Sequence, residues 1–165
     1  MKSKLIEKLF NLAYTDSMTG TLNRNSYEEQ LNKLRQSRTV LDNISVVVVD
    51  IDDLKQINDT YGHHTGDEAI CFVAEILKST IGEKADVYRV GGDEFVCISD
   101  RSDVLPYVAQ FMDYIGFENK GRCCKVGVSV GYGTFIKNKH KSIDDLIKCC
   151  DKKMYADKKK KHTSG

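Results

Sequence analysis

The feature that most constrains the fold is a run of four valines within the segment ISVVVVD, residues 44–50. β-Branched residues favour strands, and a run that is apolar on both faces indicates a strand buried at the centre of a sheet. The segment ends in Asp50, which places a carboxylate at the rim of that sheet. The run is far shorter than the roughly 20 apolar residues of a membrane-spanning helix, so we expect no direct insertion into a membrane.

Hydrophobic periodicity and turn residues predict the remaining elements. We expect strands on either side of Gly91 and Gly92, joined by a type I′ turn in which both glycines have positive φ, and a further strand over residues 125–135. Residues 60–67, TYGHHTGD, are expected to form a loop. Helices are expected over residues 1–13, 25–37 (capped by Asn23), 53–59, 67–80, 102–117 and 142–158. This order predicts an α+β sandwich in which helices cover a mainly antiparallel central sheet.

The composition is that of one globular domain: 165 residues, of which 41% are hydrophobic and 30% charged. The net charge is only +1, and basic residues concentrate in residues 151–162, which contain six lysines and only two aspartates. A protein that binds duplex nucleic acid would spread its basic residues over one face, so we expect no nucleic-acid polymer as a partner. The lysine run at residues 158–161 is interpreted as a solvated end.

Six cysteines form no C-x-x-C motif, and four of them occur as adjacent pairs at residues 123–124 and 149–150. This spacing is not typical of zinc sites or of thiol redox centres. We therefore expect reduced thiols in a cytoplasmic protein.

Three carboxylates are candidates for chemistry: Asp50 at the end of the valine strand, and Asp93 and Glu94 directly after the two glycines. If the glycine hairpin pairs with the valine strand, all three lie at one edge of the sheet. Like charges so close repel one another unless a cation neutralises them. Mg²⁺ or Mn²⁺, bound by few carboxylates and shared with phosphates, meets that need, although these acids could instead be solvated loop residues. An EF-hand is excluded because Lys55 and Tyr61 occupy the positions where it needs glycine and glutamate.

Residues 91–95 read GGDEF, and two further motifs precede them: DSMTGTLNR at residues 16–24 and DIDDLKQINDTYGHHTGDEAI at residues 50–70. Together these motifs resemble the GGDEF domain of the diguanylate cyclase family, over about residues 14–160. The resemblance implies a palm-like sandwich of the nucleotidyl-cyclase or ferredoxin-like type. It also implies an activity, the condensation of two GTP into cyclic di-GMP with release of two pyrophosphates, in a homodimer whose half-sites each hold one GTP.

The resemblance assigns roles to the residues of the rim. Asp50 and Asp93 would hold Mg²⁺ or Mn²⁺ through their side chains, and Ile51 would do so through its backbone carbonyl. Asp93 would also accept the proton of the ribose 3′-OH with help from Glu94, because a hydroxyl needs a base beside the metal to attack at neutral pH. Lys55 is also assigned to the catalytic residues, because its positive charge would contact triphosphate oxygens.

Further substrate contacts are implied in the same way. Lys158 would meet triphosphate oxygens, and the backbone amide of Leu54 would contact phosphate. Gly91 and Gly92 would let the hairpin backbone approach the nucleotide, which a Cβ would block.

Three residues are implied in reading the base. Asn58 and Asp67 match the family's guanine-binding positions, and His63 matches a position close to the nucleotide. The carboxylate of Asp67 can accept from both N1–H and N2–H of guanine, a donor pair that adenine lacks, so GTP is favoured. The alternatives are that Asn58 caps a turn together with Asp59, and that His63 only closes the loop.

The chain departs from the family pattern in two places. An inhibitory R-x-x-D site often lies five residues before GGDEF, but Gly82 and Ala85 occupy those positions here, so we expect no product inhibition. The common ending A-K-x-x-G-R-N reads DKKKKHT at residues 157–163, which keeps Lys158 but has His162 in place of the arginine. Histidine is mostly neutral at pH 7 and cannot form a bidentate fork on phosphate.

These departures leave two other functions open. The chain could be a non-catalytic GGDEF module that binds GTP and regulates another process. His162 favours this reading, whereas the complete GGDEF run and Asp50 argue against it. A synthase of a mixed purine dinucleotide is the other alternative, which Asp67 disfavours.

The expected organisation has three parts. Residues 1–13 form a linker or stalk helix that follows an upstream sensor domain, unless this helix simply packs on the domain. Residues 14–160 form the GGDEF domain, and residues 161–165 form a disordered tail. We expect a cytoplasmic location, either free or as the cytoplasmic part of a larger membrane-anchored protein.

Overall fold

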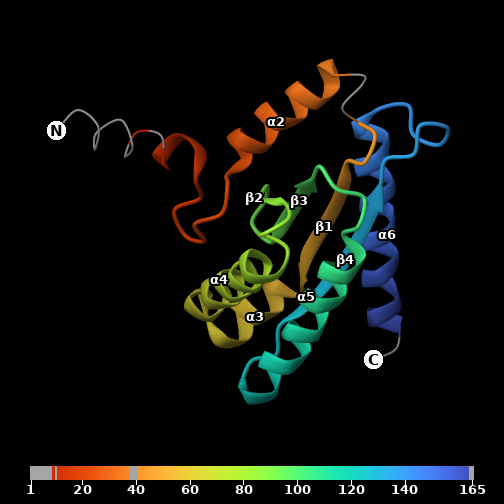
Figure 1. Ribbon diagram of the computed structural model, residues 1–165. Helices are drawn as coiled ribbons and strands as arrows, with labels where there is room; N and C mark the ends of the chain where they lie inside the picture. Colours follow the sequence, from red (N-terminus) through yellow and green to blue (C-terminus); the bar gives the residue numbers. More distant parts are fainter. Residues whose placement is uncertain (1–8, 10, 38–40, 164–165) are drawn as a thin grey trace.

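The computed structural model describes residues 9, 11–37 and 41–163, and its centre is a four-stranded sheet with the order β2-β3-β1-β4 (Figure 1). All neighbouring strands pair antiparallel, and β1 is hydrogen-bonded on both sides. The expected α+β sandwich with a mainly antiparallel sheet is therefore confirmed. The strands are β1 (Ser45–Asp52), β2 (Asp86–Arg89), β3 (Glu94–Ser99) and β4 (Gly127–Thr134).

β1 is the strand predicted from the valine run, and all of its residues are buried. Side chains alternate between the two faces of a strand. Val46 and Val48 therefore join one hydrophobic core, while Val47 and Val49 join the other. Because β1 extends past Asp50 to Asp52, the face that carries Asp50 ends in two carboxylates.

Helices cover both faces of this sheet. α4 and α5 pack on the face of Val47, around a core that includes Leu77 and Phe111. α2 and α6 pack on the opposite face, and Figure 1 shows α6 running beside β4. The helices are α2 (Arg24–Gln36), α3 (Leu54–Tyr61), α4 (His63–Thr80), α5 (Leu105–Glu118), the short 3₁₀ helix η1 (Asn119–Gly121) and α6 (Ile143–Thr163).

The loop expected over residues 60–67 is wrong. α3 continues to Tyr61 and α4 begins at His63, so that only Gly62 separates the two helices. Gly62 has a φ of 89°, which a residue without a Cβ adopts at no steric cost, and its N–H donates to the Asn58 carbonyl. The glycine at position 66, which is typical of a loop in the sequence, lies inside α4 instead.

The type I′ turn expected at Gly91 and Gly92 is also wrong. Neither glycine has a positive φ. The connection between β2 and β3 is a wider loop over residues 90–93, in which the N–H groups of Val90 and Gly91 donate to the Glu94 carbonyl. A Cβ at position 91 would lie 2.9 Å from Glu94 Oε2, so the Glu94 side chain would have to shift to accommodate it.

The N-terminal segment extends the sheet at β2. Residues 9 and 11–14 are helical, but most of the helix expected over residues 1–13 lies outside the described residues. After it, the Leu22 N–H donates to the Val87 carbonyl and the Arg89 N–H donates to the Leu22 carbonyl. Asn23 accepts from the Ser26 N–H and caps α2, as predicted.

The last helix extends further than we expected from the sequence. α6 continues to Thr163, so the predicted helix end at residue 158 is wrong and residues 161–163 are helical. The lysine run is not simply a solvated end either, because Lys158 and Lys161 hydrogen-bond to residues of the sheet. Residues 164–165 lie outside the described part of the chain.

The six cysteines are all free thiols. Cys97, Cys124 and Cys150 are buried, as expected of core residues, whereas Cys123 is exposed. Among the described residues, no helix has the length and apolar character needed to cross a bilayer.

Candidate active site

The register between β1 and β3 brings the predicted rim residues together. Asp50 pairs with Glu94 across the two strands. Next to this pair, the Ile51 N–H donates to the Asp93 carbonyl at 3.0 Å, which ties the GGDEF turn to the end of β1. The N–H and C=O of a strand residue point to the same side, so the Ile51 carbonyl also faces this turn. Asp50, Ile51, Asp93 and Glu94 therefore share one rim of the sheet.

Lys158 reaches this rim from α6. Its Nζ donates to Asp50 Oδ1 in an ion pair whose side chains are 27% and 11% exposed, respectively. Burial raises the pKa of Asp50, and the charges of Asp93 and Asp52 add to the rise while Lys158 opposes it. Burial alone would lower the pKa of Lys158, but the Asp50 carboxylate outweighs it and the lysine pKa is raised. Lys158 thus stays charged beside a rim that holds more negative than positive charge.

Glu94 lies in the same acidic surroundings. Burial raises its pKa, and the negative charges of Asp50, Asp93 and Asp151 raise it further. The side chain lines a hollow of about 420 Å³ together with residues of α2 and α6. A carboxylate with a raised pKa binds a proton more readily than an exposed one, which suits a general base.

The oxygens at the rim fit a divalent cation that is shared with phosphate. Mg²⁺ is commonly held through one or two carboxylates, with substrate phosphates and water completing its shell. Asp50 and Asp93 supply carboxylates, and burial together with the negative charges of Asp93 and Asp52 raises the pKa of Asp50. Within the described residues, no group of three or more His, Cys, Asp or Glu side chains could hold a metal ion. The three carboxylates expected from the sequence therefore share the rim, but among the described residues they do not form a metal-binding cluster by themselves.

The residues predicted to read the base lie at the junction of α3 and α4. The Asn58 side chain packs against the backbone of α4, since a Cβ on Gly66 would lie 1.9 Å from Asn58 Oδ1. His63 and Asp67 lie exposed in the first turns of α4. The absence of a side chain at Gly66 is therefore what lets the Asn58 amide approach the helix that carries the other two residues.

Leu54 and Lys55 form the first turn of α3. Asp53, directly before them, has a φ of 55° and a ψ of 30°, a left-handed conformation that turns the chain from β1 into the helix. Leu54 packs partly buried against the core, and Lys55 is exposed. The first N–H groups of a helix have no partner within the helix and favour anions, so this turn can receive a phosphate group.

Sequence reasoning missed Arg89, which hydrogen-bonds to the loop over residues 90–93 that carries the start of the GGDEF motif. Arg89 donates from Nη2 to the Gly92 carbonyl at 2.8 Å and from Nη1 to Asp16 Oδ1 at 3.1 Å. Burial favours the protonated form of Asp16, but hydrogen bonds from Thr19 and Arg89 outweigh it and lower the pKa of Asp16. The available signal was an aspartate at the start of the first motif and an arginine two residues before GGDEF.

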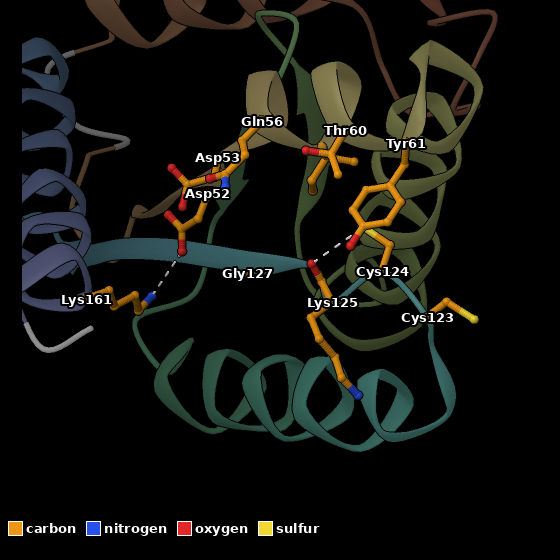
Figure 2. A pocket seen from close by; sticks show the side chains of 11 residues that line it. Asp52, Asp53, Gln56, Thr60, Tyr61, Cys123, Cys124, Lys125, Gly127 and Lys161 are labelled. Carbon is orange, nitrogen blue, oxygen red and sulfur yellow. Dashed lines mark hydrogen bonds and ion pairs between the residues drawn. The ribbon is translucent and has the colours of Figure 1, made fainter.

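A pocket of about 470 Å³ opens beside the rim (Figure 2). Its lining includes Asp52, Gln56, Thr60, Lys125 and Lys161. None of the residues predicted to contact GTP, all of which belong to the described chain, lines this pocket. The predicted nucleotide contacts thus lie outside this hollow.

Comparisons with known proteins agree with these features. The family model described as diguanylate cyclase, GGDEF domain, matches residues 13–164. The chain is similar to a probable diguanylate cyclase, DgcI of Escherichia coli K12, with 31% identity over 94% of this chain and 34% of that protein. It is also similar to the cyclic di-GMP phosphodiesterase PdeB of Shewanella oneidensis, with 33% identity over 89% of this chain and 17% of that protein. The chain spans about a third of the length of the first of these relatives.

A solved structure supports the same assignment. The coiled coil and GGDEF domain of DgcB from Caulobacter crescentus, in complex with c-di-GMP, superposes with a TM-score of 0.80 at 26% identity, over 95% of this chain and 86% of that chain. Because the family model matches nearly the whole chain, this chain belongs to the GGDEF domain family of diguanylate cyclases.

Proposed function

We propose that this chain condenses two GTP molecules into cyclic di-GMP and releases two pyrophosphates. The observation that carries the proposal is the rim where Asp50, Asp93 and Glu94 meet Lys158. In each of two equivalent steps, the 3′-oxygen of one GTP bonds to the α-phosphorus of the other. The proton of the hydroxyl passes to a carboxylate, and the bond to pyrophosphate breaks.

Asp50 and Asp93, with the Ile51 carbonyl, are the groups that would hold Mg²⁺ or Mn²⁺. A divalent cation there makes the α-phosphate more electrophilic and the 3′-hydroxyl more acidic. Asp93 is the proposed proton acceptor. Glu94 assists it, because the raised pKa of Glu94 gives that carboxylate a greater affinity for a proton.

Lys55 and Lys158 are proposed to contact triphosphate oxygens from two sides, one from α3 and the other from α6. The amide of Leu54, at the start of α3, would bind a phosphate oxygen in the same region. No atom lies within 4 Å of the position that a Cβ on Gly92 would take, so the turn formed with Gly91 is open to an approaching nucleotide.

Guanine selection is proposed to rest on the α3–α4 junction. The Asp67 carboxylate would accept from N1–H and N2–H of guanine, and the Asn58 amide would bind a further edge of the base. His63 lies exposed in the first turn of α4, at this junction, and is proposed to contact the nucleotide.

One chain supplies one half-site, so the proposed reaction needs a homodimer. The specific activity should rise with protein concentration until dimers predominate, and a constant specific activity across that range would contradict the proposal. We further propose that an upstream sensor domain sets dimerisation through residues 1–13, and that the domain works in the cytoplasm.

Cyclic di-GMP should not inhibit this chain. Gly82 and Ala85 stand where the inhibitory R-x-x-D site has its charged residues. A Cβ on Gly82 would lie 2.4 Å from the backbone oxygen of Lys78, so this backbone has no room for an arginine there. Initial rates measured with added cyclic di-GMP test this, and tight noncompetitive inhibition would contradict it.

The second candidate is a GTP-binding module without activity, which His162 favours because it stands where the family has arginine. Chromatography of the nucleotides formed from GTP and Mg²⁺ separates the two functions. Cyclase activity predicts cyclic di-GMP from the wild type and from Asp113→Ala, a control on the exposed side of α5, but none from Asp93→Ala. If the wild type binds GTP without forming product, dimerisation should be forced through the N-terminal helix. Continued lack of product would then favour the regulatory module.

A further inference from the structure

The last turns of α6 are fastened to the free edge of β4. Lys161 Nζ donates to Asp157 Oδ2 at 2.7 Å and to the Val128 carbonyl. The same Asp157 oxygen accepts from the Val130 N–H at 3.2 Å. β4 is an edge strand, and its outward N–H and C=O groups need partners. The pair formed by Asp157 and Lys161 supplies partners for two of them.

Lys161 also reaches the second carboxylate at the end of β1. Figure 2 shows its side chain pointing to Asp52, with 3.7 Å between Lys161 Nζ and Asp52 Oδ2. The other oxygen of Asp52 accepts from Ser129 Oγ at 2.5 Å. Neither residue 157 nor residue 161 matches the alanine and glycine of the A-K-x-x-G-R-N ending. The ion pair between Asp157 and Lys161 is therefore a feature of this chain rather than of the pattern that the chain resembles.

Two lysine–aspartate pairs consequently lie side by side. Asp50 and Asp52 are alternate residues of β1 and share one of its faces, while Lys158 and Lys161 are about one turn apart on α6. Lys158 pairs with Asp50 and Lys161 with Asp52. The pair formed by Lys161 and Asp52 lies nearer to the end of α6 than the pair formed by Lys158 and Asp50 at the rim.

We propose that Lys161, together with Asp157, is a positioning residue that holds Lys158 at Asp50 and thereby at the GTP triphosphate. The inference rests on the function proposed above. Helix ends fray because their last carbonyl groups have no partner within the helix. Among the described side chains of α6, Met154 is the last that belongs to the core, and the turn that carries Lys158 comes after it. The anchor at Lys161 lies past Lys158 and keeps that turn on the sheet.

This role predicts an effect on GTP binding that exceeds the effect on folding. Lys161→Met keeps the aliphatic chain and removes the charge, and it loosens only a segment outside the core. Binding of 3′-deoxy-GTP, which lacks the attacking hydroxyl and cannot cyclise, is measured by calorimetry with Mg²⁺. We expect binding to weaken roughly tenfold, as for the loss of one charged hydrogen bond, with little change in the unfolding temperature. Lys161→Arg should restore affinity, and Lys152→Met, on an exposed position of the same helix, should leave it unchanged.

A double-mutant cycle shows whether Lys161 acts through Lys158. In a Lys158→Met background, the further change Lys161→Met should have no effect on affinity, because there is no longer a lysine to position. Equal affinity of Lys161→Met and wild type, or full additivity in the cycle, would overturn this inference but would leave the proposed function standing. A wild type that does not bind 3′-deoxy-GTP would overturn the proposed function as well.

Discussion

Gly131 lies where the backbone of α6 packs closely against β4. A Cβ at this position would lie 1.9 Å from the Cys150 carbonyl oxygen and 2.5 Å from the Met154 nitrogen. Both atoms belong to the backbone of α6, so no side-chain rotation can relieve the overlap. In Gly131→Ala the helix must therefore move away from the strand by about 1.5 Å, the difference between 1.9 Å and the 3.4 Å of ordinary contact.

The cost of that movement can be estimated from the core beneath the helix. Leu146, Cys150 and Met154 all belong to the core between α6 and the sheet, and each would lose part of its packing. Overpacking of this kind costs about 1–3 kcal/mol, and we expect the upper end because the backbone itself has to shift. For a domain of this size, about 3 kcal/mol lowers the unfolding temperature by roughly 6–12 °C.

Thermal unfolding followed by circular dichroism measures this effect. Gly116→Ala on α5 is the matched control, because no atom lies within 4 Å of its added Cβ, and it should be neutral or slightly stabilising. Gly131→Ala should also bind 3′-deoxy-GTP more weakly than Gly116→Ala, since Lys158 moves with the helix. An unfolding temperature of Gly131→Ala within about 2 °C of the wild type would refute the reasoning.

Three further predictions concern charge, reactivity and base choice. The pKa of Asp16 is lower in the folded protein than its ordinary value of 3.8, so its bonds to Arg89 and neighbours stabilise the fold above that pH and are lost as the pH falls through the lowered pKa. Asp16→Asn should thus be about 1 kcal/mol less stable than wild type at pH 6, and this difference in the free energy of unfolding should shrink in acid. A difference that stays the same at every pH would contradict this. Under native conditions iodoacetamide should label Cys123 before Cys97, whose pKa burial raises to about 12, and mass spectrometry that found both labelled at the same rate would refute it. Asp67→Asn should reduce the preference for GTP over ATP roughly tenfold in calorimetric affinities, and an unchanged preference would remove Asp67 from the base site.

Much of the fold could be predicted because its signals are local. The valine run identifies β1, since β-branched residues favour strands wherever they occur. Asn23 identifies the start of α2, because its side chain caps that helix. The errors occurred where a local signal had two meanings. Gly62 lies between two helices, whereas Gly62 and Gly66 together suggested a longer loop. The pair Gly91-Gly92 suggested positive φ values, but neither glycine has one, because the chain forms a wider loop there.

The sequence by itself determined the family, the central strand and the residues from which an active site could be built, because linked motifs and propensities are properties of short segments. Only the tertiary structure decided how those residues meet. Lys158 and Asp50 are 108 positions apart, and their contact depends on how α6 lies across β1 and β4. The same is true of Lys161, which the sequence indicated only as part of a charged end. Pairs so distant in sequence are set by strand register and by close approaches such as that at Gly131, and neither is encoded in a short segment.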